Sequence, residues 1–282
     1  MSTVRIERIK PHIGGIVHVD KEHLLDGETI AAVRAALEDR GVLVFPRMSL
    51  TDAEQLAFTD RLGTRLNYNR KAPGSGAADE EDVYAITLDK KINAMVAEYL
   101  KGSFFWHIDG ASDDVPNFAA LLTARTLSTS GGQTQFVNTY AAWDDLPEDE
   151  KKSLEKLRVV HSFEWSQRHH NPTPTYDELQ MWQSYPHKVH PLVWTHRSGR
   201  KSLILGSTAS HIEGMNIEEG RLLLCKLMDW ATQPQFIYKH DWTVGDLLIW
   251  DNTGTMHRVT HYDLDSGRMM HRTTLLGEEA LV

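Results

Sequence analysis

The sequence predicts one domain, residues 1–282, that is mainly β: a sheet sandwich or barrel with flanking helices. Short apolar runs bounded by turn residues dominate the middle and the end of the chain, and few segments carry helical periodicity. Apolar residues make up 41% of the chain and charged residues 24%, which is the balance of a folded protein rather than a disordered one. With 282 residues, the chain is long enough to bury a sizeable core.

The first quarter of the chain alternates strands with two helices. The expected elements are short strands within 4–19, a helix over 26–40, a buried strand over 42–46 and a helix from 51 to about 63. The first helix carries apolar residues at Ile30, Val33 and Leu37 and is followed by Gly41, a residue that commonly ends helices. The second helix begins with Thr51 and Glu54, the spacing of a capping box.

The rest of the chain is dominated by strands. Up to residue 157 the expected elements are a loop over 67–82, a strand over 83–88, strand pieces within 117–140 that Ser130-Gly131-Gly132 interrupts, and a helix over 141–157. Strands over 159–163, 188–194 and 202–205 then surround a long loop over 169–184. A helix over 218–232 and strands within 235–276 complete the chain. Both long loops, 67–82 and 169–184, have the length and composition of loops that close over a site, so we expect them to form a lid.

Composition excludes several classes of protein. The net charge is −9 and the sequence pI about 5.9, so no basic surface indicates nucleic acid or anionic lipid as a partner. One cysteine, Cys225, excludes an internal disulfide framework and a cysteine-rich zinc site, and we expect it to be a small buried hydrophobe. No apolar run approaches the roughly 20 residues that span a bilayer, and Met1–Lys10 lacks a signal-peptide core. We therefore expect no membrane association and a cytoplasmic, reducing location.

The most informative of the fifteen histidines is in His107-Ile108-Asp109. Two residues separated by one in an extended segment project to the same face. An imidazole and a carboxylate placed in this way can occupy two adjacent positions on one metal ion. Ferrous enzymes with open coordination sites use two histidines and one carboxylate, which leave three positions free. This pair therefore predicts two ligands of a metal and requires a third.

His257 is the best candidate for the third ligand, because it follows an apolar strand and a polar turn, 245–256. Two arginines, Arg268 and Arg272, come shortly afterwards, and the planar guanidinium group can clamp the distal carboxylate of a small diacid. Spacing alone leaves two alternatives open. Arginines near a C-terminus are often ordinary surface charge, and His271 competes as a ligand.

These segments together resemble the taurine dioxygenase family, which also includes the 2,4-dichlorophenoxyacetate dioxygenases. The resemblance spans nearly the whole chain, in order and with suitable spacing. The segments that carry it are Trp106-His107-Ile108-Asp109, Ser130-Gly131-Gly132-Gln133-Thr134, Ile249-Trp250-Asp251-Asn252 through His257, and Arg268-Met269-Met270-His271-Arg272-Thr273-Thr274-Leu275-Leu276-Gly277.

The resemblance implies a clavaminate synthase-like double-stranded β-helix, or jelly roll, with iron at one mouth. It implies an enzyme that hydroxylates a C–H bond of a small molecule. Its cofactor would be Fe(II), its cosubstrates 2-oxoglutarate and O2, and its coproducts succinate and CO2. By this resemblance, His107, Asp109 and His257 would be the iron ligands. Thr134 would hydrogen-bond 2-oxoglutarate, and Arg268 would pair with its C5 carboxylate. Arg272 would contact the cosubstrate or an anionic group of the substrate, and His271 would be a supporting residue. We also expect a homo-oligomer, a dimer or a tetramer.

The expected substrate differs from taurine. The taurine enzyme has an asparagine where this chain has Ser103, and a histidine where this chain has Tyr68. Phe104 adds apolar bulk beside the metal ligands, so a larger, partly apolar or aromatic substrate fits better, with an acid group that Arg272 could bind. The alternatives are an enzyme that cleaves aryloxyalkanoates or alkyl sulfates and sulfonates, a non-catalytic jelly-roll binding protein, and a zinc hydrolase.

Overall fold

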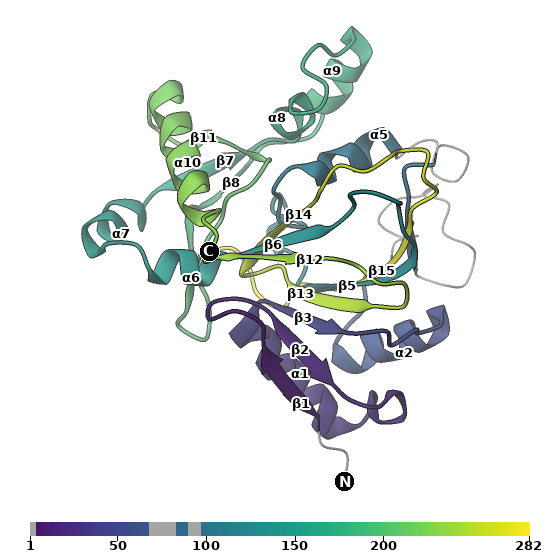
Figure 1. The fold of residues 1–282 in the computed structure, drawn as a ribbon. Coiled ribbons are helices and arrows are strands. Elements are labelled where there is room, and N and C mark those ends of the chain that lie inside the picture. Colours follow the sequence, from purple (N-terminus) through teal and green to yellow (C-terminus); the bar gives the residue numbers. More distant parts are fainter. Residues whose placement is uncertain (1–3, 68–82, 90–96) are drawn as a thin grey trace.

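A seven-stranded sheet forms the centre of the protein in the computed structural model, which describes residues 4–67, 83–89 and 97–282 (Figure 1). In order across the sheet, its strands are β1 (Arg5–Arg8), β2 (Gly15–His18), β3 (Val42–Phe45), β13 (Leu247–Asp251), β5 (Ala119–Thr126), β15 (Met269–Leu275) and β4 (Tyr84–Ile86). Neighbours pair antiparallel except β2 and β3, which are parallel. The strands expected near the N-terminus and near the C-terminus are thus confirmed and meet in one sheet.

A second sheet faces the first and encloses an apolar interior. It consists of β12 (Ile237–His240), β6 (Thr134–Asn138) and β14 (Thr255–Val259), all antiparallel. Phe136 of β6 packs on Trp250 of β13 with ring centroids 5.6 Å apart. Both side chains belong to a buried cluster that also holds Ala120 and Met270 of the large sheet. We name this packed layer between the two sheets the intersheet core.

Helices α1 (Gly27–Arg40) and α2 (Asp52–Leu62) cover the opposite face of the large sheet (Figure 1). Their apolar residues form one cluster with outward-facing sheet residues, for example Phe58 with Phe45. The capping box expected at the start of α2 is present: Glu54 donates its backbone N–H to the Thr51 hydroxyl and accepts the Thr51 N–H. The sequence therefore predicts both helices and their buried faces correctly.

A second group of helices lies on the other side of the small sheet. It consists of α6 (Thr139–Asp144), α7 (Glu148–Leu154) and α10 (Ile217–Ala231). The single helix expected over 141–157 is wrong, because Pro147 lacks an N–H and interrupts it between α6 and α7. Helix α10 is as expected and buries Leu224 and Leu227, but Cys225 lies on its exposed side. The expectation that Cys225 is buried is therefore wrong, since a helix turns about 100° per residue.

Half of the segment expected as a long loop, 169–184, is helical. Helix α8 (Phe163–Arg168) precedes it and α9 (Tyr176–Gln183) lies within it, and the pair projects away from the two facing sheets (Figure 1). Thr175 and Glu178 form a second capping box at the start of α9. The polar composition of the segment favoured a loop in the sequence analysis, although Thr175 and Glu178 have the spacing of a helix start. The other expected lid loop, 67–82, lies outside the described residues except for Asn67.

The remaining strands form two small sheets, and the fold is mixed α/β rather than mainly β. One sheet holds β11 (Ala209–Ile212), β7 (Arg158–His161) and β8 (Lys188–Pro191), and the other pairs β9 (Val193–Thr195) with β10 (Lys201–Leu203). The short helices are η1 (Lys21–His23), α5 (Ala97–Leu100) and η2 (Lys101–Phe104). No helix in the described part of the chain is long and apolar enough to cross a membrane.

Gly254 is expected to be essential for stability, because it allows the turn between β13 and β14 to approach α6. A Cβ atom at this position would lie 1.7 Å from Cε2 of the buried Tyr140. We expect Gly254→Ala to lower the free energy of unfolding by about 3 kcal/mol or more, the upper end of the usual range for overpacking. The control is Gly27→Ala in the first turn of α1, where a Cβ meets nothing within 4 Å. Urea denaturation measures both, and equal stability of the two variants would contradict the expectation.

Candidate active site

A pair of reciprocal backbone hydrogen bonds joins His107 to His257. The His107 N–H donates to the His257 carbonyl at 3.0 Å, and the His257 N–H donates to the His107 carbonyl at 2.9 Å. His257 lies in β14, and His107 lies in an extended segment that forms an isolated bridge with it. The pairing brings the two imidazole rings to a centroid separation of 4.1 Å. Residues 150 positions apart in the sequence thus lie at one place beside the intersheet core.

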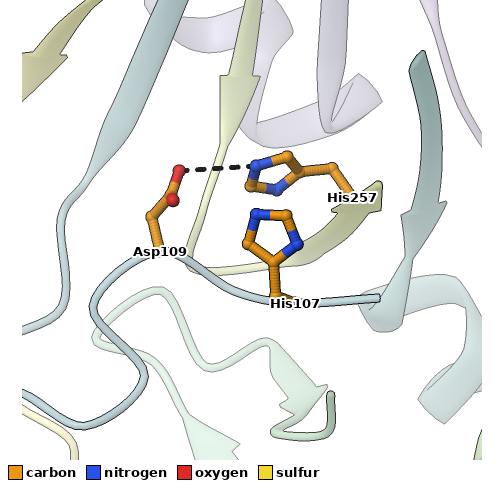
Figure 2. Close-up of side chains that lie close together, drawn as sticks. All are labelled: His107, Asp109 and His257. Carbon is orange, nitrogen blue, oxygen red and sulfur yellow. Dashed lines mark ion pairs between the residues drawn. The ribbon is translucent and has the colours of Figure 1, made fainter. Parts of the chain in front are cut away.

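The structure brings the three predicted metal ligands together. Figure 2 shows the side chains of His107, Asp109 and His257 pointing toward one another. One ligand atom of each lies within 4.8 Å of the others, and Asp109 Oδ2 is 3.5 Å from His257 Nε2. The three side chains could hold one metal ion, and they form the sole such cluster of three or more candidate ligands found among the described residues.

The surroundings of both histidines favour the neutral imidazole. His107 Nδ1 lies 2.8 Å from the Phe105 carbonyl, which can only accept, so Nδ1 carries the proton and Nε2 keeps its lone pair. Burial lowers the pKa of His107. Burial and the neighbouring His107 hold the pKa of His257 well below its usual value. Two neutral imidazoles are what a divalent transition metal requires.

Arg272 keeps Asp109 ionised. Burial alone raises the pKa of this carboxyl, but Arg272 and the two imidazoles lower it by more, so that the net shift is downward. The Arg272 Nη2 group donates to Asp109 Oδ2 at 2.6 Å. Because a cationic partner stabilises the ionised form, this carboxylate can bind a metal without first losing a proton. The predicted contact of Arg272 with a cosubstrate or substrate stays a prediction.

The turn before β11 packs against the backbone of the segment that carries His107. Gly206 has a φ of +112°, and a Cβ there would lie 3.1 Å from the His107 Cα and from the Trp106 carbonyl oxygen. The next residue, Ser207, donates its N–H to that carbonyl at 2.7 Å. The backbone around His107 is therefore held on two sides, by His257 and by this turn.

Thr134 lies on the same face of the small sheet as His257. Strand register pairs His257 with Phe136 and Val259 with Thr134, and side chains two apart in a strand share a face. Thr134 is only 4% exposed, and its hydroxyl oxygen accepts the indole N–H of Trp242 at 2.9 Å. The predicted cosubstrate residue thus lies on the inner face of the small sheet, next to a tryptophan that sequence reasoning missed.

Arg268 is buried immediately before β15, with 4% of its surface exposed. Its Nη2 group donates to the Gly132 carbonyl at 3.2 Å, and its guanidinium lies 4.9 Å from the ring centre of Tyr262. Its Nε atom is buried without a hydrogen-bond partner among the described residues. An arginine as buried as this is not surface charge, which removes one of the two alternatives that spacing left open.

His271 is not a ligand in this arrangement. Its Nδ1 atom lies 2.7 Å from Asp52 Oδ1 in α2, on the outer side of the large sheet. Alternation along β15 directs it away from its neighbour Arg272, which reaches Asp109 on the inner side. The second alternative therefore fails, and His271 supports the packing of α2.

Two of the predicted substrate residues, Ser103 and Phe104, have partners of their own. The Ser103 hydroxyl donates to the Leu100 carbonyl at 2.6 Å, so a substrate would meet it as an acceptor. Phe104 stacks on His261 at 4.3 Å and meets Tyr262 edge-on at 5.7 Å. Tyr68 lies outside the described residues. Their roles in substrate binding stay predictions.

A row of aromatic side chains extends from the site to helices α8 and α9. Tyr99 of α5 has 56% of its surface exposed, and its ring stacks on Phe163 with centroids 6.1 Å apart. Burial and, after it, the negative charge of Asp109 raise the pKa of its phenol. Phe163 in turn packs on Tyr185 at 4.5 Å. We name Tyr99, Phe163 and Tyr185 the aromatic row. The sequence held no signal for it, since its members come from three separate segments of the chain.

Known proteins resemble this chain over nearly its full length. The 2,4-dichlorophenoxyacetate dioxygenase of Burkholderia sp. (strain RASC), named as α-ketoglutarate-dependent, is 35% identical over 273 residues, which are 94% of this chain and 91% of that protein. An alkylsulfatase of Acinetobacter baylyi is 31% identical, over 96% of this chain and 83% of the relative. The crystal structure of AAD-2 in complex with Mn(II) and N-oxalylglycine superposes with a TM-score of 0.82 at 34% identity, covering 99% of this chain and all of that one.

A family model described as "Taurine catabolism dioxygenase TauD, TfdA family" matches residues 5–274. Because the match covers nearly the whole chain and agrees with the relatives above, the protein belongs to the TauD, TfdA family and is an α-ketoglutarate-dependent dioxygenase, an oxidoreductase.

Proposed function

We propose that the protein uses Fe(II), 2-oxoglutarate (α-ketoglutarate) and O2 to hydroxylate a C–H bond of a small, partly apolar acid, and that an aryloxyalkanoate is the substrate class. The observation that carries the reaction type is the cluster of two neutral imidazoles and one carboxylate beside the intersheet core. Two buried hydrogen-bond donors, the Thr134 hydroxyl and the Arg268 Nε–H, accompany it and have no acceptor among the described residues. The proposed domain is residues 1–282 with a jelly-roll arrangement of the two facing sheets.

The donor set of the three ligands suits ferrous iron. Two histidines and one carboxylate on a single face leave open positions for a chelating cosubstrate and for oxygen. The unused donors suit a carboxylate. The Thr134 oxygen accepts from Trp242, so its hydroxyl proton is still available to donate. The Nε–H of Arg268 is also an unused donor among the described residues. A buried donor without an acceptor is costly, and an anionic oxygen would satisfy both.

The protein's own residues hold and orient the reactants. When bound, the iron supplies the oxidative chemistry that couples decarboxylation of 2-oxoglutarate, to succinate and CO2, with C–H hydroxylation. His107, Asp109 and His257 would hold the metal, Arg272 fixes the orientation of Asp109, and Arg268 with Thr134 would bind the C5 carboxylate. The two apolar sheet faces exclude water from the interior.

Two observations support an aromatic acid as the substrate. The aromatic row begins at Tyr99, whose phenol is subject to the charge of Asp109, and it would offer ring faces to an aryl group. The relatives include enzymes named for 2,4-dichlorophenoxyacetate and for (S)-phenoxypropionate. Sulfate esters are the second candidate, because other relatives are named alkylsulfatase and sulfate ester dioxygenase. Whether the protein forms a dimer or a tetramer stays a prediction.

The metal site is tested by Asp109→Asn, which removes one anionic ligand. We expect Mn(II), used as a probe for Fe(II), to bind on the order of 100-fold more weakly to this variant. Free Mn(II), measured by electron paramagnetic resonance, gives the affinity. The control is Asp114→Asn, an exposed carboxylate that pairs with Lys188 and should leave the affinity unchanged. Wild-type affinity in Asp109→Asn would rule out the proposed ligand set.

The cosubstrate site is tested by Arg268→Met, which keeps the bulk of the side chain and removes its charge. We expect the KM for 2-oxoglutarate to rise roughly 100-fold, because a buried charged partner is lost, while Mn(II) affinity stays unchanged. Succinate release measures the first quantity. Arg197→Met, on the surface, is the control. A KM close to that of the wild type would show that Arg268 does not bind the carboxylate.

The substrate class is tested by oxygen consumption with aryloxyalkanoates, alkyl sulfates and taurine. We expect the highest kcat/KM for an aryloxyalkanoate, and Tyr99→Leu should lower it about tenfold while sparing alkyl sulfates, since a ring contact contributes about 1 kcal/mol or more. Tyr176→Leu, an exposed tyrosine of α9 with 76% of its surface accessible, is the matched control. Turnover of taurine alone would contradict the proposed class.

A further inference from the structure

The contact between Trp242 and Thr134 has a fixed direction. An indole N–H can only donate, so in the 2.9 Å hydrogen bond Trp242 is the donor and the Thr134 oxygen is the acceptor. A threonine hydroxyl has one proton, and this bond does not use it. The bond therefore occupies one lone pair of the oxygen and restricts the rotation of the hydroxyl, so that its proton points away from the indole.

The hydroxyl proton of Thr134 has no acceptor among the described residues, although the side chain is 96% buried. It lies on the inner face of the small sheet, where the register also places His257. Two residues earlier in the chain, the Gly132 carbonyl anchors Arg268, whose buried Nε–H is likewise unused. Two donors without acceptors are thus fixed to the same end of β6.

Trp242 is itself held rigidly. The His240 ring meets it perpendicularly, with centroids 4.7 Å apart. The two ring nitrogens of His240 are hydrogen-bonded in turn, Nδ1 to the Tyr238 hydroxyl at 2.9 Å and Nε2 to Asp246 at 3.0 Å. Asp246 also accepts the backbone N–H of Thr243, the residue after Trp242. This network fixes the position of the indole N–H, and through it the orientation of the Thr134 hydroxyl.

We propose that Trp242 is a positioning residue for 2-oxoglutarate that acts through Thr134. By donating to the threonine oxygen it directs the one hydroxyl proton toward the distal carboxylate, next to the guanidinium of Arg268. The inference rests on the proposed function and adds a residue that does not itself touch the cosubstrate. The opposing interpretation is that Trp242 only fills space in the buried cluster around Phe136.

Trp242→Phe separates the two interpretations, because phenylalanine keeps an aromatic ring and lacks the N–H. Calorimetric titration of the Mn(II)-loaded protein with N-oxalylglycine, a non-reacting analogue of 2-oxoglutarate, measures binding without turnover. We expect binding to weaken about fivefold, the effect of one hydrogen bond, with unchanged Mn(II) affinity. The matched control is Trp230→Phe, which removes an indole N–H that donates to the Ala142 carbonyl at 2.8 Å, outside the site.

A double-mutant cycle with Thr134→Val shows whether the effect passes through the hydroxyl. If it does, Thr134→Val weakens N-oxalylglycine binding, and adding Trp242→Phe to it causes no further loss. Equal weakening by Trp242→Phe in both backgrounds, or none beyond that of Trp230→Phe, would overturn the inference while leaving the proposed function intact. Failure of the Mn(II)-loaded wild type to bind N-oxalylglycine would overturn the proposed function and this inference with it.

Discussion

The backbone bridge between His107 and His257 determines the chemistry of this protein. The segment that carries two of the three metal ligands belongs to no long strand, so two hydrogen bonds set its register. A shift by one residue would turn its side chains to the opposite face and separate the ligands. The close approach of Gly206 on the other side prevents the segment from moving away. The two regular sheets stabilise the fold, whereas this short contact places its reactive groups.

The site is connected to the fold through the inner faces of two sheets. His257 and Thr134 come from the small sheet, and Arg272 comes from the large one. Their spacing therefore depends on how the sheets pack, which large buried rings such as Phe136 and Trp250 fix. Such packing is dense and resists compression, so ligand positions are held within narrow limits without the metal. The side chains of His107, Asp109 and His257 would therefore hold a metal with little rearrangement.

Local signals in the sequence predicted local features well. The capping box at Thr51 and the His107–Asp109 pair both follow from spacing within a few residues. The same rule would have found α9 through Thr175, but the polar composition of that segment indicated a loop. Features that depend on distant contacts could not be predicted in this way. The hydrogen bond from Trp242 to Thr134 joins residues 108 positions apart, and no periodicity carries that information.

The charges of the assigned site residues favour anionic ligands. Two guanidinium groups, Arg268 and Arg272, accompany a single carboxylate, Asp109, and both imidazoles are neutral. A divalent metal would add two further positive charges in a partly buried space, where uncompensated charge is costly. The dianion 2-oxoglutarate would offset most of this excess and leave one positive charge. A substrate with one acid group would neutralise the remainder, which is the electrostatic reason to expect a monoanionic acid rather than a neutral molecule.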